Sequence, residues 1–505
     1  MTAPKNLPHI VLILCDQLRT DALGFMGNRL ARTPNLDALA RAGTVFENLF
    51  VQAPVCMSSR ASLLTGRYPR TARMGGGSPL LDPREVTLAE ILQHADYRTG
   101  LFGKLHLTPQ EYTLKTLGSD RTISDARVFL EAAGLPPMPD DPCKRNYGFQ
   151  HVVGHEDLLW GEYRDWLRAR DASLAARLPE RPWAPWPGWR RLCAEAAHGL
   201  PDVGPTILPP DLHPSIFIAQ SAADFFSARH AEGPCFLHVS FTDPHPPFAP
   251  PEELFRLFPP DAMPLPRYAD TGALRWPASL RERWPDFSGV TPENTRAVIA
   301  CYYAMIAMID RALGHLIAAI TATGDLERTL FVFTADHGEF LGDYGLFRKG
   351  AFHYDCLLRA PGFVSWRGQL PAGRRLTGLT QTIDLAPTIL GLAGMPPAAG
   401  MQGNDLALAL ARSEQIGRPW TYTESYRALW GPFVDCWTLR TAGAKLNYYP
   451  RDRTGHLFDL AQDPDERRDL FDDPARRALR DDLLATLIEA VHSQTDPLPR
   501  VMCQY

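Results

Sequence analysis

The sequence predicts an α/β fold in which helices sandwich a large, mostly parallel sheet, with a smaller α+β domain at the C-terminal end. Three continuous apolar runs, His9–Cys15, Cys235–Phe241 and Leu330–Thr334, have the composition of strands that are buried on both faces. Segments with helical periodicity separate these runs. Alternation of this kind is typical of a parallel sheet whose crossover helices cover both faces.

The other elements of the large domain follow in chain order. Thr33 as N-cap and Pro34 in the first turn begin a helix that Gly43 ends. The remaining expected elements are a strand at Val45–Val51, a helix from Cys56, a helix around Thr87–Ala95, a strand at Tyr97–Gly103, and helices near Ser215–Ala228, Pro292–Thr323 and Ile383–Leu392.

A stretch rich in Pro and Trp, residues 108–215, interrupts this alternation, with one helix expected near Gly161–Arg170. We interpret it as an insertion that shapes a pocket or a subunit contact rather than as core. Gly394–Gly403 indicates a boundary between a large domain at 1–395 and a small domain at 400–505. The small domain is expected to hold strands at Trp437–Arg440, Lys445–Tyr449 and His456–Leu460 and a helix near Pro474–His492.

The composition excludes several classes of partner. The 505 residues carry 52 Lys and Arg against 57 Asp and Glu, a formal charge of −5, which provides no basic footprint for nucleic acid or an anionic membrane. No apolar stretch has the length and uniformity of a membrane span, and the short run Ile10–Leu14 lacks the flanks of a signal peptide. Nine scattered cysteines without a CxxC pair are typical of reduced thiols, so we expect a cytoplasmic protein.

Short polar clusters follow the three apolar runs: Asp16-Gln17, Asp243-Pro244-His245 and Asp336-His337. The carboxyl ends of parallel strands share one edge of a sheet, so these clusters can converge. Carboxylate and amide oxygens suit Ca²⁺ or Mg²⁺, and the imidazole leaves Mn²⁺ open. Taken singly, each cluster is more simply explained as a helix cap or a solvated turn. Together they predict a site for one divalent metal ion.

A cysteine stands at the start of a short apolar helix in the segment Val55-Cys56-Met57-Ser58-Ser59-Arg60. The positive end of the helix dipole favours anionic chemistry at Cys56. Arg60 lies one turn later, close enough to share such an anion. The alternative from these residues alone is a buried core cysteine with an arginine on the surface.

These segments together resemble the sulfatases of the alkaline phosphatase superfamily. The resemblance rests on Asp16-Gln17, the signature Cys-x-x-Ser-Arg-x-x-x-Leu-Thr-Gly-Arg that begins at Cys56, Gly103-Lys104-Leu105-His106, Thr242-Asp243-Pro244-His245, Asp336-His337-Gly338 and Lys349. The C-terminal Leu457–Leu460 with Asp463–Glu466 is similar to the closing segment of the family. The resemblance covers nearly the whole chain except about 108–215 and implies an alkaline phosphatase-like fold.

The resemblance implies an unusual nucleophile at position 56. In that family the signature cysteine is oxidised to formylglycine, whose hydrate attacks with one hydroxyl and expels the anion by collapsing to the aldehyde with the other. The implied ligands of the divalent metal, which lowers the pKa of the attacking hydroxyl, are Asp16, Gln17, Asp336 and His337, with residue 56 also reaching the metal.

The same resemblance assigns roles to the basic residues. Arg60 would hold the alkoxide of the nucleophile, and Lys104 and Lys349 would clamp sulfate or phosphonate oxygens as point charges. His245 is the candidate general acid for the leaving oxygen. His106 is a candidate for helping the diol to collapse.

Two departures from the family pattern bear on the chemistry. The usual maturation signal has Pro two residues after the cysteine, whereas this chain has Ser58, which leaves an unmodified Cys56 thiol as an alternative. Gln17 and His337 stand where many sulfatases have Asp and Asn. That pairing is more similar to the branch of phosphonate monoester hydrolases and choline sulfatases.

We therefore expect a metal-dependent hydrolase that cleaves sulfate esters and acts on a small anionic substrate. Hydrolysis of phosphonate monoesters or phosphodiesters is the close alternative. Two others are a catalytically silent sulfatase-like binding protein and an enzyme that uses the Cys56 thiolate directly. A formylglycine-generating enzyme is the expected partner, and a homo-oligomer the expected assembly, with neither nucleic acid nor membrane as a partner.

Two further patterns have simpler explanations than a functional one. His151 and His155 have the helical spacing of metal ligands, but Gly154 and the flanking turn residues weaken that interpretation. The acidic run Asp463–Glu466 is most simply a solvated turn.

Overall fold

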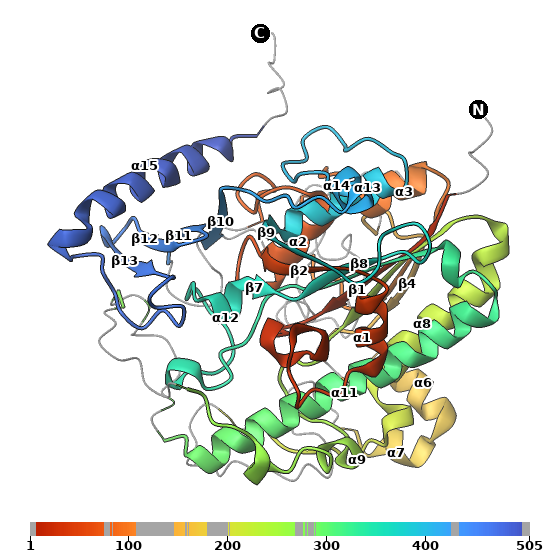
Figure 1. Ribbon diagram of the computed structural model, residues 1–505. Coiled ribbons are helices and arrows are strands. Elements are labelled where there is room, and N and C mark those ends of the chain that lie inside the picture. The colour runs from red at the N-terminus through yellow and green to blue at the C-terminus, as the bar shows by residue number, and fades with distance from the viewer. Residues whose placement is uncertain are drawn as a thin grey trace, which may run out of the picture.

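Two sheets organise the chain in the computed structural model (Figure 1), a nine-stranded sheet and a four-stranded sheet near the C-terminal end. The larger sheet is mixed but mostly parallel and is flanked by helices, which confirms the predicted fold class. The domain boundary between 395 and 400 stays a prediction. The structure describes residues 7–74, 81–82, 84–107, 146–156, 159, 161–178, 200, 202–267, 276–277, 280, 287, 289–425 and 434–496.

The strands of the large sheet come from segments spread along residues 9–381. They are β1 (His9–Cys15), β2 (Gly43–Phe50), β3 (Arg98–Gly103), β4 (His151–Gly154), β5 (Cys235–Phe241), β6 (Thr329–Ala335), β7 (Arg359–Ala360), β8 (Gly362–Ser365) and β9 (Arg374–Gln381). Their order is β4-β3-β5-β1-β6-β8-β2-β7, with β9 paired to β2. The first five strands of this order form a continuous parallel block with β1 near its centre.

Helices cover both faces of the large sheet (Figure 1). The first face carries α1 (Pro34–Arg41), α8 (Pro214–Arg229) and α11 (Pro292–Ala322), and the second carries α2 (Cys56–Thr65), α3 (Leu88–His94), α13 (Leu385–Leu392) and α14 (Ala407–Arg412). Other described helices are α6 (Glu162–Arg170), α7 (Ala172–Ala176), α9 (Glu252–Phe255) and α12 (Asp355–Leu358).

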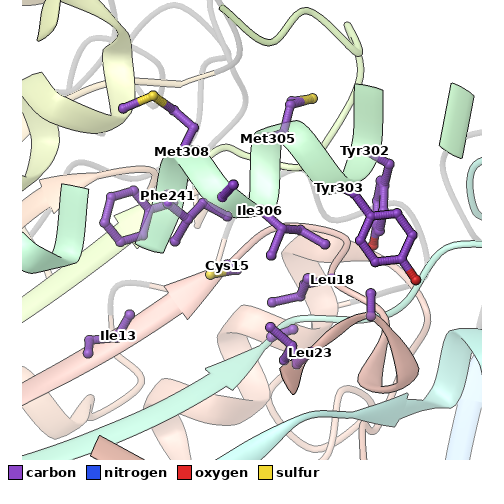
Figure 2. Packing of buried hydrophobic residues seen from close by; sticks show 14 of the residues in the cluster. Ile13, Cys15, Leu18, Leu23, Phe241, Tyr302, Tyr303, Met305, Ile306 and Met308 are labelled. Carbon is purple, nitrogen blue, oxygen red and sulfur yellow. The ribbon is translucent and has the colours of Figure 1, made fainter. Parts of the chain in front are cut away.

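The side chains of β1 explain why its sequence is apolar without alternation. Val11, Ile13 and Cys15 pack in the core of the first face, and their neighbours Ile10, Leu12 and Leu14 pack in the core of the second. Successive side chains of a strand point to opposite faces, so a strand covered on both sides must be apolar throughout. Figure 2 shows Ile13 and Cys15 on this strand beneath Ile306 and Met308 of α11.

Helix α11 corrects one expectation from the sequence. Within the described ranges it is the helix long and apolar enough to cross a membrane by length and composition, with a mean hydropathy of 1.4. The expectation that no stretch has that length and apolarity is therefore wrong. In the fold, most of this window is buried, and α11 packs against α8, α1 and the sheet beneath.

The predicted insertion at 108–215 is wrong in part. His151–Gly154 is strand β4, which pairs in parallel with β3 at the edge of the main sheet. His151 therefore lies in a strand rather than a helix, and its ring stacks on Phe225 at 5.1 Å, a contact typical of packing. The helix expected near Gly161–Arg170 is confirmed as α6, whereas residues 108–145 and 179–199 lie outside the described part of the chain.

The smaller sheet is antiparallel throughout. It consists of β10 (Trp420–Ser425), β11 (Cys436–Thr441), β12 (Ala444–Tyr449) and β13 (Thr454–Asp459), and α15 (Arg477–Ser493) packs against it. The three expected strands and the expected helix are confirmed. Strand β10 was not predicted.

A group of four charged residues, two buried and two partly buried, joins this sheet to the large domain, and we call it the C-terminal charge cluster: Asp355, Arg440, Lys445 and Glu466. The Lys445 ammonium lies 2.9 Å from Asp355 and 2.5 Å from Glu466, and Glu466 accepts a hydrogen bond from the Asp355 N–H at 2.7 Å. Glu466 is 1% exposed. For this residue, the expectation of a solvated turn is wrong.

Candidate active site

The three polar clusters predicted at strand ends do follow neighbouring strands, because β5, β1 and β6 are adjacent in the sheet. The Asp16 N–H donates to the Phe241 carbonyl at 3.1 Å, and the Asp336 N–H donates to the Cys15 carbonyl at 3.2 Å. The ladder hydrogen bonds thus continue into the site residues themselves. This fixes the backbone of the site to the centre of the sheet.

Four buried side chains converge at this edge. One ligand atom each from Asp16, Cys56, Asp336 and His337 lies within 4.8 Å of all the others. The His337 Nε2 is 3.7 Å from an Asp16 oxygen and 3.6 Å from an Asp336 oxygen, while its Nδ1–H donates to the Gly338 carbonyl at 2.8 Å. That donation leaves Nε2 as the acceptor nitrogen, the form of imidazole that binds a metal.

Gln17 adds an oxygen to this set. Its backbone has φ 65°, and its N–H donates to Asp336 Oδ1 at 3.0 Å. Its side-chain Nε2 donates to Glu339, and its Oε1 is buried with no hydrogen-bond partner in the described residues. A buried carbonyl oxygen that accepts no hydrogen bond from the protein is the arrangement expected of a cation ligand. Two carboxylates, an amide oxygen and an imidazole fit a divalent metal ion.

The sulfur of Cys56 lies inside this group. It is 3.1 Å from His337 Nε2 and 3.6 Å from Asp16 Oδ1, and the Lys349 ammonium lies 2.7 Å away. Burial, followed by the Asp16 carboxylate, raises the pKa of Cys56 to about 12, although Lys349 lowers it. The surrounding protein groups therefore keep the thiol protonated at neutral pH, despite its position in the first turn of α2.

The Arg60 side chain is fully buried and holds the carboxylates. Its Nε donates to Asp336 Oδ2 at 2.7 Å, its second nitrogen to the Lys104 carbonyl and the Ser240 hydroxyl at 2.8 Å each, and its third lies 3.5 Å from Asp16. Arg60 thus orients both aspartates. Its predicted contact with the alkoxide of the nucleophile stays a prediction.

Two lysines complete the charge of the site. Lys104 lies 2.7 Å from Asp16 Oδ2, and Lys349 lies 3.7 Å from Asp16 Oδ1. Burial alone would raise the pKa of Asp16, but Lys104 and Lys349 hold it well below its usual range. Burial also lowers the pKa of His337, so its imidazole is neutral at pH 7. Three cations, Arg60 included, thus face the carboxylates of Asp16 and Asp336.

The two other candidate histidines lie in turns beside the cluster. The Nδ1–H of His245 donates to the Pro246 carbonyl at 2.6 Å, since a carbonyl only accepts, and its charge contributes to the lowered pKa of Asp16. His106 has φ 52°, and its N–H and that of Leu105 donate to the Glu156 carboxylate at 3.2 and 3.1 Å. The catalytic roles of both histidines stay predictions.

Glycines allow the site segments to pass close to other backbone. A Cβ at Gly338 would lie 1.8 Å from the Cys356 carbonyl, and one at Gly103 would lie 2.0 Å from the Ser240 carbonyl. Both distances are far below any real contact. The glycines next to His337 and Lys104 are therefore needed for close approach.

Sequence reasoning missed three residues that support the site: Ser240, Glu156 and Glu339. Ser240 is the penultimate residue of the apolar strand β5 and gave no separate polar signal. Glu156 lies in the stretch that we had interpreted as an insertion. Glu339 stands two residues after His337, and the single signal for it was its place in the run Asp336-His337-Gly338-Glu339.

Comparisons with known proteins show what the chain is similar to. The chain is 26% identical to an arylsulfatase of Clostridium perfringens over 97% of this chain and 95% of the relative. It is 28% identical to the "multifunctional alkaline phosphatase superfamily protein PehA" of Trinickia caryophylli, over 93% and 92%. Among solved structures, the phosphonate monoester hydrolase of Agrobacterium radiobacter has the same fold, with a TM-score of 0.76, 24% identity and coverage of 97% and 96%.

Family models give the decisive match. A model described as "N-sulphoglucosamine sulphohydrolase, C-terminal" matches residues 342–493. The sulfatase model matches residues 8–395, more than half of the chain, and that range includes every site residue described above. The chain belongs to the sulfatase family.

Proposed function

We propose that this protein is a metal-dependent hydrolase of small sulfate esters that uses residue 56 as its nucleophile. The observation that carries the proposal is the position of the Cys56 sulfur. It lies 3.1 Å from His337 Nε2 and 3.6 Å from Asp16, which are candidate metal ligands, and 2.7 Å from the Lys349 ammonium. A nucleophile, a cation site and a fixed positive charge thus meet at one point, as attack on an anionic ester requires.

Asp16, Gln17, Asp336 and His337 would hold one divalent ion, Ca²⁺, Mn²⁺ or Mg²⁺. When bound, such an ion lowers the pKa of the attacking hydroxyl and neutralises substrate oxygens. Arg60 keeps the two aspartates in place through its contacts with Asp336 and Asp16. Because these side chains are buried and already oriented, little reorganisation accompanies binding.

The need to release the product anion favours an oxidised form of residue 56 over direct thiolate chemistry. A thiolate adduct with the anion would have to be broken by a second attack at sulfur or phosphorus. In the formylglycine hydrate, two hydroxyls replace the sulfur, so one attacks while the other later collapses to the aldehyde. The Lys349 ammonium, in hydrogen-bond contact with the sulfur, would then hold one of these oxygens.

The remaining groups suit an anionic ester. The Lys349 side chain is 21% exposed, whereas Lys104 and Arg60 are fully buried, so Lys349 is the cation that an incoming substrate meets first. The Nδ1–H of His245 is engaged with the Pro246 carbonyl, which leaves Nε2 as the nitrogen able to donate a proton to the leaving oxygen.

The test combines mass spectrometry with turnover. Conversion of Cys56 to formylglycine lowers the mass of its peptide by about 18 Da. We expect that loss in active protein; an unshifted peptide in active protein contradicts the aldehyde mechanism and favours the thiolate. Chelation should abolish turnover, and a divalent ion should restore it.

Substrate preference is tested on the same preparation. We expect an aryl sulfate to be turned over faster than a phosphonate monoester or a phosphodiester. A phosphonate monoester hydrolysed far faster than the sulfate reverses this order and favours the alternative activity. No turnover of any of the three by a metal-loaded, converted protein favours a sulfatase-like binding protein.

We infer further that the protein works in a reducing compartment, the cytoplasm, as a homo-oligomer matured by a formylglycine-generating enzyme. The support for the compartment is that the cysteines in the described ranges, which include Cys15, Cys56 and Cys235, form no disulfide bonds. Mass measurement of the assembly and localisation by fractionation test these inferences.

A further inference from the structure

A buried glutamate lies behind the candidate ligand Gln17. Glu339 has no exposed surface, and its side chain accepts three hydrogen bonds in the described structure. One oxygen, Oε1, accepts from the backbone N–H groups of Leu341, at 3.0 Å, and of Arg348. The other oxygen, Oε2, accepts from the Gln17 side-chain Nε2.

These contacts determine which way round the Gln17 amide lies. The Gln17 nitrogen faces Oε2 and donates to it, while the two backbone N–H groups occupy Oε1. The Gln17 oxygen must then point away from Glu339, and it is the buried oxygen without a hydrogen-bond partner noted above. The Gln17 N–H is bonded to Asp336 Oδ1, so this residue is fixed beside a second candidate ligand.

We propose that Glu339 is a positioning residue that sets the polarity of the Gln17 amide, so that oxygen rather than nitrogen is offered to the metal ion. The inference rests on the metal site of the proposed function. Glu339 itself does not need to touch the ion. It acts by excluding the rotamer in which the amide NH₂, a donor with partial positive charge, would face the cation.

The same contact explains why position 17 is neutral. An Asp or Glu at position 17 has no N–H to donate to Glu339 Oε2, so two carboxyl groups would lie buried against each other. An amide provides the metal-facing oxygen and a donor for Glu339 at once. Neutral Gln17 and acidic Glu339 therefore form a matched donor–acceptor pair, and either residue can be exchanged alone only with loss.

The decisive variants are Glu339→Gln and the swap Gln17→Glu with Glu339→Gln. In the single variant, the two backbone N–H groups at Oε1 require the amide oxygen of the new side chain. Its NH₂ then faces the Gln17 NH₂, and Gln17 must flip and present nitrogen to the metal. In the swapped variant, the carboxylate at 17 accepts from the NH₂ at 339 and still offers an oxygen, with the total charge unchanged.

The readout is metal affinity, which does not depend on turnover. Mn²⁺ is titrated into chelator-treated protein by calorimetry, and the melting temperature is followed with and without the ion. We expect Glu339→Gln to weaken Mn²⁺ binding by about tenfold to a hundredfold, the range typical for partners of metal ligands. The swapped variant should recover to within about threefold of the wild type.

The control is Glu424→Gln, which alters another buried glutamate that accepts a backbone N–H, here that of Arg70 at 2.8 Å, away from the candidate ligands. It should leave Mn²⁺ affinity unchanged. Unchanged affinity in Glu339→Gln, or a swapped variant that binds no better than the single one, overturns the inference while the metal site stands. Failure of the wild type to bind Mn²⁺ overturns the metal site and the inference with it.

Discussion

The active site and the C-terminal charge cluster contain similar charged pairs and differ in how completely their polar groups are satisfied. Both contain a fully buried lysine held by a carboxylate: Lys104 lies 2.7 Å from Asp16, and Lys445 lies 2.9 Å from Asp355. In the C-terminal charge cluster, two cations meet two carboxylates. In the active site, the Gln17 amide oxygen lies beside the charged pairs and has no hydrogen-bond partner in the described residues.

This difference separates structural charges from chemical ones. A buried ion pair whose members satisfy each other holds two segments together and has no charge left for a ligand. The active site keeps a buried amide oxygen without a donor in the described residues, and this oxygen becomes satisfied when a metal ion binds. Burial and pairing alone would not distinguish the two clusters, whereas this unsatisfied oxygen does.

The largest effect is expected from Asp336→Ala. The change removes a candidate metal ligand and the main partner of the Arg60 guanidinium, so both metal binding and hydrolysis should be lost. We expect turnover to fall by about a thousandfold or more and Mn²⁺ binding to become undetectable by calorimetry. Full activity in this variant would refute the site assignment.

The sharpest comparison makes the same change in both clusters. Lys445→Met leaves Asp355 and Glu466 buried together, and we expect the free energy of unfolding to fall by about 3–5 kcal/mol. Lys104→Met leaves Asp16 with Arg60 and Lys349, so it should cost less stability but about a hundredfold to a thousandfold in turnover. Urea unfolding and initial rates measure the two effects. Equal stability losses would remove the distinction between the clusters.

An intermediate effect is expected from pH, through His353 beside the C-terminal charge cluster. Burial, followed by Lys445, lowers its pKa to about 3, and its ring nitrogens contact Thr438 and Ser425 at 2.7 and 2.8 Å. Between about pH 6.5 and pH 3, His353 therefore binds a proton in the unfolded chain but not in the folded state. Stability is fully present above pH 6.5 and falls as the pH drops, by about 1.4 kcal/mol per pH unit for this residue.

The pH effect is checked by urea unfolding between pH 7 and pH 4 in the wild type and in His353→Asn. The variant should show a shallower decline, because one proton-binding group of the unfolded state is missing. The buried His213 and His238, whose pKa values burial lowers to about 3, contribute in the same direction and keep some decline in the variant. An unchanged slope would contradict the assignment to His353.

The smallest effect separates two neighbours in one acidic run. Asp465 pairs with Arg267 on the surface, where both side chains are well exposed, so Asp465→Ala should change the free energy of unfolding by less than about 0.5 kcal/mol. Glu466→Ala removes a buried partner of Lys445 and should cost several times more. Chemical denaturation of the two variants in parallel measures this. A similar cost at both positions would show that burial does not decide it.

Elements with strong local patterns could be predicted from the sequence. The apolar strands β1, β5 and β6 were found because both of their faces are covered, and the polar residues after them located the site edge. Strands β7 and β8 are short, and β9 carries Arg374, Arg375 and exposed polar positions, so neither apolar continuity nor strict alternation marks them. Strand β4 has four residues at the sheet edge, and its pairing with β3, rather than a pattern in its own sequence, makes it a strand.

The burial of two glutamates, Glu339 in the active site and Glu466 in the C-terminal charge cluster, could not be predicted for a related reason. Glutamate is usually a surface residue, and these two are buried because distant segments supply their donors: Gln17 for Glu339 and Lys445 for Glu466. Such partners are defined by tertiary structure and leave no periodic signal. Cys56 and Asp336 could be predicted because each combines a chemically suitable side chain with a recognisable position. Cys56 stands at the start of a helix, and Asp336 directly follows an apolar strand.

The burial of Cys56 limits the stage at which another protein could modify it. This residue is 3% exposed and lies in the first turn of α2, which packs in the core of one sheet face. A protein-sized catalyst that must enclose the chain around position 56 cannot do so once α2 has docked. The maturation proposed above would therefore compete with folding, and a chain that folds first would keep its thiol.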